Sequence, residues 1–365
     1  MWKLNVNVEK TKVMCFGYSR KNDCYKFLYE DRELEIVSSY KYLGIIFESS
    51  GFFTKCRVNQ KTQAEKAMFS LLRKCKKLDL SIDVQLELFD KLVVPVLLYG
   101  CEVWGYENLK QIEQLHVKFC KYIMLVKKNT PNSMVHGELG RYPLDITVKC
   151  RMLSFWTKLV NYSECNKYSS RMYNQLRIMF DNNILKTKWM MYIKGILDEC
   201  GLSYVWNQNK INAKWLILQV KQTLKDIFVQ QWLGQLDNSN KTLNYRMYKT
   251  EFRFEKYLIE LPVELRVMLS KFRLGGMRLP VDRGRFQNIP RERRFCDFCD
   301  SEQLGDEFHM ILECKSLVDL RKKYLPTFCL NSINMFKFSN VMNVTNNKQL
   351  INLSRFIKEL NKLQK

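Results

Sequence analysis

Residues 291–314 read RERRFCDFCDSEQLGDEFHMILEC, and this stretch dictates how the C-terminal part of the chain folds. Two residues separate Cys296 from Cys299, nine separate Cys299 from His309, and four separate His309 from Cys314. Three thiolates and one imidazole are a complete tetrahedral ligand set for zinc, and a C-x2-C turn lets two sulfurs point at one ion. The sequence therefore predicts one structural Zn²⁺ ion held by Cys296, Cys299, His309 and Cys314.

The alternative is that these are ordinary core cysteines in a chain that has 13. Against it, the chain has only three histidines, and one of them falls at a ligand spacing beside a C-x2-C pair. Gly305 is expected to break the chain direction, so that His309 and Cys314 face the ion from a short helix. Cys329 lies beyond the ligand set and is expected to remain a free thiol.

The composition predicts a folded and strongly basic protein. A length of 365 residues is enough for two or three domains, and 46% hydrophobic residues argue against disorder. Lys and Arg number 60 against 37 Asp and Glu, giving a net charge of +23. Such an excess favours a polyanionic partner, most often nucleic acid, although a basic surface without a partner is the alternative.

Neither a membrane nor an oxidising compartment is expected. The longest apolar run, residues 92–99, is too short to cross a bilayer, and no Lys-rich segment flanks a long apolar span. The cysteines are odd in number and scattered, and no signal peptide is recognised. These features predict free thiols and an intracellular location, in the nucleus, the cytoplasm or both.

The first 50 residues favour strands, and the rest of the chain favours helices. Short β-rich runs separated by turns predict strands at residues 3–8, 13–17, 26–29, 35–37 and 42–47. Helical spacing begins near Ala64, Ser81 is the expected cap of the next helix, and Pro95 is expected to kink or end it. His116 is expected to pack rather than bind metal, and the core is expected to hold Trp156, Trp189, Trp206, Trp215 and Trp232.

Residues 271–294 form a basic segment, which we call the connector. It reads KFRLGGMRLPVDRGRFQNIPRERR, with eight Lys or Arg and two acids. Residues 296–314, which we call the knuckle, contain six acids and no Lys or Arg, and three thiolates outweigh the charge of zinc. We therefore expect the knuckle to order the connector, and the connector to grip RNA or DNA phosphates through Lys271, Arg273, Arg278, Arg283, Arg285, Arg291, Arg293 and Arg294. The alternative is that these arginines pair with the acids of the knuckle.

Three stretches resemble one protein family. Residues 7–16, NVEKTKVMCF, resemble the segment after the catalytic turn, lettered motif D, in reverse transcriptases of non-LTR (LINE-type) retrotransposons. Residues 40–45, YKYLGI, resemble motif E, the hairpin that grips the primer end. The connector and knuckle resemble the zinc-knuckle end of the same proteins.

The middle of the chain carries the resemblance further, in the same order. Residues 98–105, LYGCEVWG, and 130–143, TPNSMVHGELGRYP, are similar to the thumb and the region after it. The resemblance implies that Lys10 and Lys12 face the incoming nucleotide. It implies a primer grip at Tyr40, Lys41, Tyr42, Leu43 and Gly44. It also implies phosphate contacts along the template–primer from the first thumb helix, through Arg73, Lys74 and Lys77.

The catalytic carboxylates of that family have no counterpart here. Its polymerases hold two Mg²⁺ ions with an Asp-Asp pair on a hairpin just before the Lys-Thr-Lys stretch. The chain begins after that position, and no two Asp residues are adjacent in it. We therefore expect a fragment of an RNA-directed DNA polymerase that binds RNA, DNA and Zn²⁺ but is not itself an enzyme, with Mg²⁺ bound only by the full-length parent.

Two other interpretations remain at this point. The chain could be a host-recruited, non-enzymatic nucleic-acid-binding or scaffold protein derived from such an element, or the product of a decayed element. An open frame encoding the Asp-Asp hairpin immediately upstream in the genome would favour the polymerase fragment.

The expected fold class is α+β and predominantly α. It comprises a small N-terminal antiparallel sheet that is a remnant of the palm, a helical thumb and linker, and a small C-terminal zinc-binding module. The expected ranges are residues 1–50 for the palm remnant, 51–160 for the thumb, 161–270 for the helical linker, 271–325 for the connector with the knuckle, and 326–365 for the tail.

Overall fold

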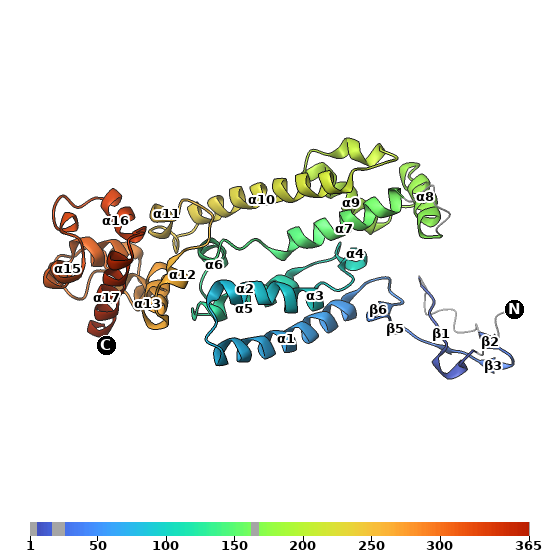
Figure 1. Ribbon diagram of the computed structural model, residues 1–365, viewed down its shortest axis with the longest axis horizontal. Helices are drawn as coiled ribbons and strands as arrows, with labels where there is room; N and C mark the ends of the chain where they lie inside the picture. Colours follow the sequence, from blue (N-terminus) through green and yellow to red (C-terminus); the bar gives the residue numbers. More distant parts are fainter. Residues whose placement is uncertain (1–5, 17–25, 162–167, 365) are drawn as a thin grey trace. The chain divides into compact units, whose positions relative to one another are not determined.

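A computed structural model describes residues 6–16, 26–161 and 168–364 (Figure 1). These residues are mainly helical, and the strands among them lie between residues 12 and 48, which confirms the α+β, predominantly α fold class. The chain divides into two compact units. The first comprises Met1–Lys74, Leu88–Leu115 and Leu144–Thr223, and the second comprises Cys75–Glu87, His116–Pro143 and Leu224–Lys365. The units therefore interleave along the chain, whereas the sequence suggested consecutive ranges.

The N-terminal strands form three separate pairs rather than one antiparallel sheet. They are β1 Lys12–Val13, β2 Leu28–Tyr29, β3 Arg32–Glu33, β4 Glu35–Ile36, β5 Ser39–Tyr42 and β6 Ile45–Glu48. The pairs β2–β3 and β5–β6 are antiparallel as expected, but β1 pairs with β4 in parallel. The hairpin β2–β3 lies between β1 and β4 in the sequence, so the chain returns to β1 in the same direction.

Two expected features of this region differ in the structure. Val8–Lys10 forms a 3₁₀ turn, η1, instead of the end of a strand, because the Asn7 side chain accepts a hydrogen bond from the Lys10 backbone N–H. The expected strand over residues 42–47 is broken by a tight turn at Leu43 and Gly44, with φ of 46° and 86°. Of the strands expected at residues 3–8 and 13–17, residues 3–5 and 17 lie outside the described residues.

The first unit is organised around helix α7. Besides η1, the strands and the end of α2 Ile82–Leu88, the elements with residues in this unit are α1 Thr54–Lys77, η2 Phe89–Val93, α3 Val94–Leu97, α4 Cys101–Trp104, α5 Lys110–Ile123, α7 Leu144–Asn161, α8 Tyr168–Asp181, α9 Lys188–Glu199, η3 Ser203–Asn207 and α10 Ala213–Asp237. Helix α7 contacts α4, α8 and α9. Its buried Trp156 stacks on Trp206 with ring centroids 5.8 Å apart and donates from Nε1 to the Tyr173 hydroxyl.

Pro95 is accommodated without ending the helical path. Helix α2, Ile82–Leu88, starts after Ser81 and continues into the π-helix η2, and α3 follows with Pro95 in its first turn. Proline lacks the backbone N–H that a continuous α-helix would use, and a π turn shifts the hydrogen bonding by one residue just before it.

The second unit packs its C-terminal helices around α17. The remaining elements are α6 Asn132–Glu138, α11 Tyr245–Tyr248, α12 Tyr257–Glu260, α13 Val263–Arg273, α14 Pro280–Phe286, η4 Arg291–Arg293, η5 His309–Glu313, η6 Lys315–Leu317, α15 Val318–Tyr324, η7 Thr327–Leu330, α16 Met335–Met342 and α17 Asn347–Leu363. Helix α17 contacts α13 and α15. In the described ranges no helix is both long and apolar enough to span a membrane.

Most of the tryptophans expected in the core are buried. Trp156 and Trp232 have no exposed surface, and Trp206 is 3% exposed. Trp189 is partly exposed and donates to the Glu102 carbonyl. The expectation was wrong for Trp215, which is 39% exposed near the start of α10.

Candidate metal centre and basic connector

A β-hairpin places Cys296 and Cys299, the first two candidate ligands of the metal site. Phe295 and Leu304 form an antiparallel bridge, and the Cys296 N–H donates to the Gln303 carbonyl at 2.9 Å. Inside this hairpin the Phe298 N–H donates to the Cys296 Sγ at 3.3 Å. The hairpin thereby turns the Cys296 and Cys299 sulfurs toward one point.

A π-helical turn places the other two ligands. The turn η5 runs from His309 to Glu313, and the Cys314 N–H donates to the His309 carbonyl at 2.8 Å. A hydrogen bond from residue i+5 to residue i brings side chains five apart onto nearly the same side of the helix. The turn is capped by Asp306, whose Oδ1 accepts from the His309 N–H at 3.1 Å.

Gly305 acts differently from the sequence-based expectation. Its φ is not in the left-handed region, so it does not reverse the chain in the way that only glycine allows. A Cβ on Gly305 would lie 2.6 Å from Pro280 and 3.0 Å from the Cys296 Cα. Glycine is needed here because the start of α14 packs directly onto the hairpin.

The four expected ligands converge on one site. Their ligand atoms all lie within 4.8 Å of one another. The Cys296 and Cys314 sulfurs are 3.8 Å apart, and the Cys299 sulfur is 3.4 Å from the His309 Nε2. A tetrahedral zinc ion with Zn–S bonds of about 2.3 Å separates two sulfurs by about 3.8 Å. The four side chains can therefore hold a metal ion, and their separations are compatible with zinc.

The surroundings of the site suit a cluster of thiolates. Glu313 Oε2 lies 3.2 Å from the His309 Nδ1, which leaves Nε2 directed at the cysteines, as in the carboxylate–histidine pairs of many zinc sites. The Arg321 guanidinium is buried and donates to the Cys314 carbonyl at 2.6 Å, and its Nη1 has no hydrogen-bond partner in the described part of the chain. One Zn²⁺ with three thiolates carries a net charge of −1, which this buried cation can offset.

The thiols already differ in acidity without a metal. Although burial opposes ionisation, hydrogen bonds from Ser301 and His309 hold the pKa of Cys299 at about 6. Burial and the neighbouring cysteines raise the pKa of Cys314 to about 12, and burial raises that of Cys296. Cys329 is a buried free thiol, as expected, and burial raises its pKa to about 11.

Several arginines of the connector hold the knuckle in place. Arg283 forms an ion pair with Asp297, and Arg291 lies 3.4 Å from Asp306. Arg294 donates to the carbonyls of Ile289 and Val281 at 2.9 and 3.0 Å. These contacts agree with the expected ordering of the connector by the knuckle, and they also match the alternative in which arginines pair with the knuckle's own acids.

The remaining connector cations divide by exposure. Arg285 lies 3.6 Å from Asp282. Arg278 and Arg293 are exposed and Lys271 is partly exposed, and none of these three forms an ion pair within the described ranges. These three cations can reach a phosphate without giving up a carboxylate partner.

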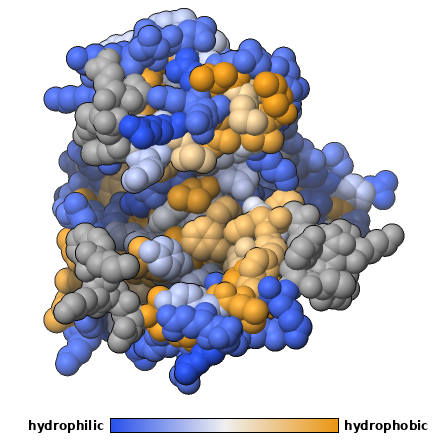
Figure 2. Space-filling model, turned by 90° about the vertical axis from the view of Figure 1, so that its right-hand side faces the viewer, coloured by the Kyte–Doolittle hydropathy of each residue, from blue (hydrophilic) through white to orange (hydrophobic). Residues whose placement is uncertain are grey.

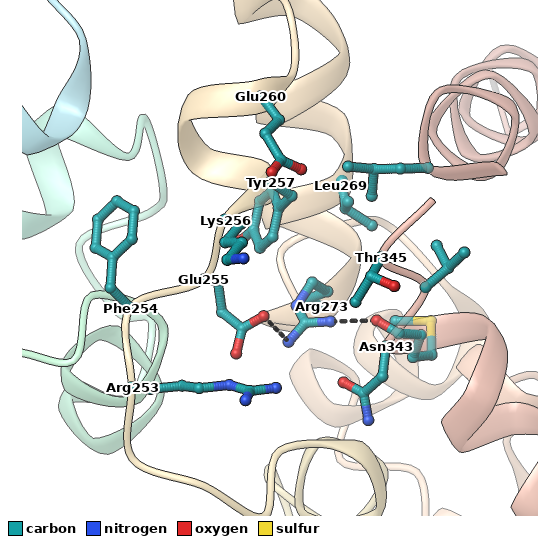
Figure 3. Close-up of a pocket in the computed structure, with 13 residues that line it drawn as sticks. Arg253, Phe254, Glu255, Lys256, Tyr257, Glu260, Leu269, Arg273, Asn343 and Thr345 are labelled. Atoms are coloured by element: carbon teal, nitrogen blue, oxygen red, sulfur yellow. Dashed lines mark hydrogen bonds and ion pairs between the residues drawn. The ribbon is translucent and has the colours of Figure 1, made fainter. Parts of the chain in front are cut away.

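The expectation for Arg273 was wrong. Its guanidinium is 1% exposed and forms a two-pronged pair with Glu138, whose side chain is fully buried, with N–O distances of 2.9 and 3.0 Å. It also donates to the Met342 carbonyl at 2.7 Å, and it lies near Glu255 beside a cavity of about 200 Å³ (Figure 3). A guanidinium enclosed in this way cannot reach a nucleic-acid phosphate, because its donors face protein acceptors.

The comparisons with known proteins show a distant similarity to a polymerase. The chain is 23% identical over 183 residues to the "Probable RNA-directed DNA polymerase from transposon X-element" of Drosophila melanogaster. The match covers 48% of this chain and 18% of that polymerase. No protein-family model matches the chain. No solved structure matches it either.

The residues assigned by resemblance to the primer grip form an exposed hairpin tip. Tyr42 is 60% exposed and Leu43 is 74% exposed. The Tyr99 hydroxyl donates to the Leu43 carbonyl at 3.0 Å, and Gln60 donates to the Gly44 carbonyl, so the turn is fixed to the helices of the first unit. Figure 2 shows that apolar residues gather in and around a hollow on this face of the molecule.

The other residues assigned by resemblance lie at the surface. Arg73, Lys74 and Lys77 are exposed along α1. Lys10 ends the turn η1, and Lys12 pairs with Glu35 across the parallel strands β1 and β4. The roles of these residues and of the hairpin remain predictions.

Three residues of the site were not found from the sequence. Glu313 could have been found, since it lies four residues after His309 on the same helical segment. Arg321 contacts the Cys314 carbonyl seven residues earlier, and Glu138 pairs with Arg273 far along the chain; no spacing pattern in the sequence marks either residue.

Proposed function

We propose that this chain is a nucleic-acid-binding, zinc-carrying part of a retrotransposon-type RNA-directed DNA polymerase. The observation that carries the proposal is the similarity over 183 residues to the X-element polymerase. The net charge of +23 and the convergence of three cysteines with one histidine support it.

Zinc would have a structural role in this proposal. Four protein ligands complete a tetrahedral site and leave no open position for a substrate or a water nucleophile. The metal would fix the hairpin of Cys296 and Cys299 to the turn of His309 and Cys314. Through the ion pairs of Asp297 and Asp306, it would also order the connector.

Nucleic acid would be bound through phosphate contacts from two basic surfaces. One is the exposed side of α1 at Arg73, Lys74 and Lys77, and the other is formed by Lys271, Arg278 and Arg293 of the connector. Contacts of this kind position a strand without reading its sequence. The knuckle itself is acidic, so it would support the connector and not bind phosphates directly.

Metal analysis and a salt titration test the proposal. The purified chain should contain about one zinc ion, and Cys296→Ser should lower that content. Combined Arg278→Ala and Arg293→Ala changes should weaken binding to all sequences and flatten the slope of log affinity against log salt by about 0.7 to 0.9 per lost contact.

A matched control is Lys214→Ala with Lys221→Ala. These lysines are exposed on α10, and their loss changes the net charge equally. This double lysine variant should leave the slope of log affinity against log salt nearly unchanged. Absence of nucleic-acid binding by the zinc-loaded chain at low salt would refute the proposal.

A further inference from the structure

A groove beside the knuckle combines guanidinium groups with an aromatic ring. Among the residues that line it are Arg283, Gln287, Arg293, Arg294 and Phe295, and its volume is about 360 Å³. Pockets that bind small molecules and cofactors have volumes of about 300 to 1,000 Å³. The groove lies entirely within the second unit and is open on one side.

The floor of the groove has a fixed shape. Arg294 lies across α14, with its Nε and Nη1 tied to the carbonyls of Ile289 and Val281. Its aliphatic part occupies the space above Gly284, where a Cβ would lie 2.5 Å from the Arg294 Cγ. A larger residue at position 284 would push Arg294 into the groove.

The ring of Phe295 is presented to solvent by rigid neighbours. It is 43% exposed, although its backbone is paired with Leu304 in the hairpin and precedes the metal ligand Cys296. Exposed apolar residues are common and need no explanation when they stand alone. Here the ring shares one groove with three guanidinium groups and an amide.

The charges in the groove are available to an anion in different degrees. Arg293 is exposed and has no ion pair in the described part of the chain. Arg283 is half exposed and pairs with Asp297, which is itself half exposed. Exposed ion pairs of this kind are weak, so a phosphate can replace the Asp297 carboxylate at little cost.

We propose that this groove takes one unstacked nucleotide of single-stranded RNA or DNA, with the base on Phe295 and the phosphate at Arg293 and Arg283. An aromatic ring and a basic wall are what single strands require, because every base has a face that can stack. A duplex keeps its bases stacked on one another and offers the groove only phosphates. This inference rests on the proposed nucleic-acid binding. It adds that the bound strand is single and that Phe295 contacts a base.

The test compares zinc-loaded Phe295→Leu with the wild-type chain by fluorescence anisotropy. Loss of one base–aromatic stack should weaken binding of single-stranded RNA and DNA by about 10-fold or more. Binding of a duplex of the same length should change less than about 2-fold, and the salt slope should stay the same, because no phosphate contact is lost. A loss on only one of the two strand types would confine the ligand to that type.

Two further variants and an altered oligonucleotide make the test specific. Phe286→Leu removes a ring that is 69% exposed nearby but does not line the groove, and it should bind as wild type. Phe295→Tyr keeps the ring and should retain affinity. An oligonucleotide with abasic sites should bind the wild type less tightly and should not distinguish it from Phe295→Leu.

The outcomes separate this inference from the proposed function. If the wild type binds nucleic acid but Phe295→Leu binds single strands equally well, the groove assignment is wrong while the proposed function stands. Equal weakening of single strands and duplex would also overturn it. If an acidic peptide binds at Phe295 and Arg293 and oligonucleotides do not, the groove serves a protein partner instead.

Discussion

The buried pair of Arg273 and Glu138 is the most enclosed charge contact described in the second unit. The Arg273 guanidinium also lies between the rings of Tyr248 and Tyr257, at 4.7 and 5.3 Å from their centroids. Burial opposes ionisation of the Glu138 carboxyl group, but the Arg273 guanidinium keeps the pKa of Glu138 below its usual value. The pair is therefore ionised, and each charge depends on the other.

Breaking this pair should strongly destabilise the protein. Arg273→Met should lower the free energy of unfolding by about 3 to 5 kcal/mol, because it leaves the Glu138 carboxylate buried without its main partner. Denaturant unfolding measures the loss. The double variant Arg273→Met with Glu138→Gln should recover part of it, whereas Arg253→Ala, which removes the exposed pair with Glu251, should cost little. A loss below about 1 kcal/mol for Arg273→Met would contradict this role.

Asp282 should make stability depend on pH. Burial, aided by Glu307, raises the pKa of Asp282 from 3.8 to about 7, and its Oδ2 has no hydrogen-bond partner among the described residues. As the pH rises from about 4 to 7, the unfolded chain loses this proton first, so the contribution of Asp282 to stability falls over that range. Asp282→Asn should remove this fall in stability, which is on the order of 4 kcal/mol for a rise from 3.8 to about 7 at about 1.4 kcal/mol per pKa unit.

Unfolding at pH 5.5 and pH 8 checks this prediction. Relative to the wild type, the free energy of unfolding of Asp282→Asn should be higher at pH 8 than at pH 5.5. Asp300→Asn changes an exposed carboxylate of the knuckle and serves as the control. An equal difference at both pH values would show that Asp282 does not titrate in this range.

At the level of elements, the knuckle depends on a hairpin and a π turn that a metal would join. Glu313→Gln should weaken zinc binding about 10- to 100-fold, since the carboxylate orients His309. Competition with a chromophoric chelator measures the affinity. Glu302→Gln, an exposed change in the same hairpin, should leave it unchanged, and Cys329→Ser should leave the zinc content at wild-type level. Equal affinities for Glu313→Gln and wild type would exclude the orienting role.

The elements show where sequence reasoning succeeds. The convergence of Cys296, Cys299, His309 and Cys314 could be predicted from spacing, because a C-x2-C turn and a nearby histidine follow local rules. Helices with regular apolar spacing were also found, and α1 contains the helical spacing expected near Ala64. The parallel pairing of β1 with β4 and the π turn before Pro95 were not found, because both depend on how neighbouring segments meet.

The same limit applies to charged residues. Arg273 and Arg293 are both arginines of the connector, yet one is buried against Glu138 and the other is exposed. Nothing in the local sequence distinguishes them. Their difference arises from contacts with residues up to 135 positions away, which only the fold establishes.

For the whole molecule, we predict that the isolated chain does not extend a primer. No two Asp residues are adjacent in it, whereas two-metal polymerases hold their ions with carboxylates. Incubation with template–primer, nucleotides and Mg²⁺ or Mn²⁺ should give no product, while the same preparation binds the template–primer. Template-dependent incorporation by the nuclease-free chain would show that the carboxylates are supplied by other positions.

The buried pair of Arg273 and Glu138 can form only late during synthesis of the chain. Glu138 leaves the ribosome long before Arg273 and the Met342 carbonyl that complete its surroundings. At about 5 to 20 residues per second, the chain needs roughly 10 to 40 s to extend from Glu138 to Met342. During that interval the buried side of α6 has no complete core to pack against, and exposed apolar surface of this kind favours aggregation until Met342 has been made.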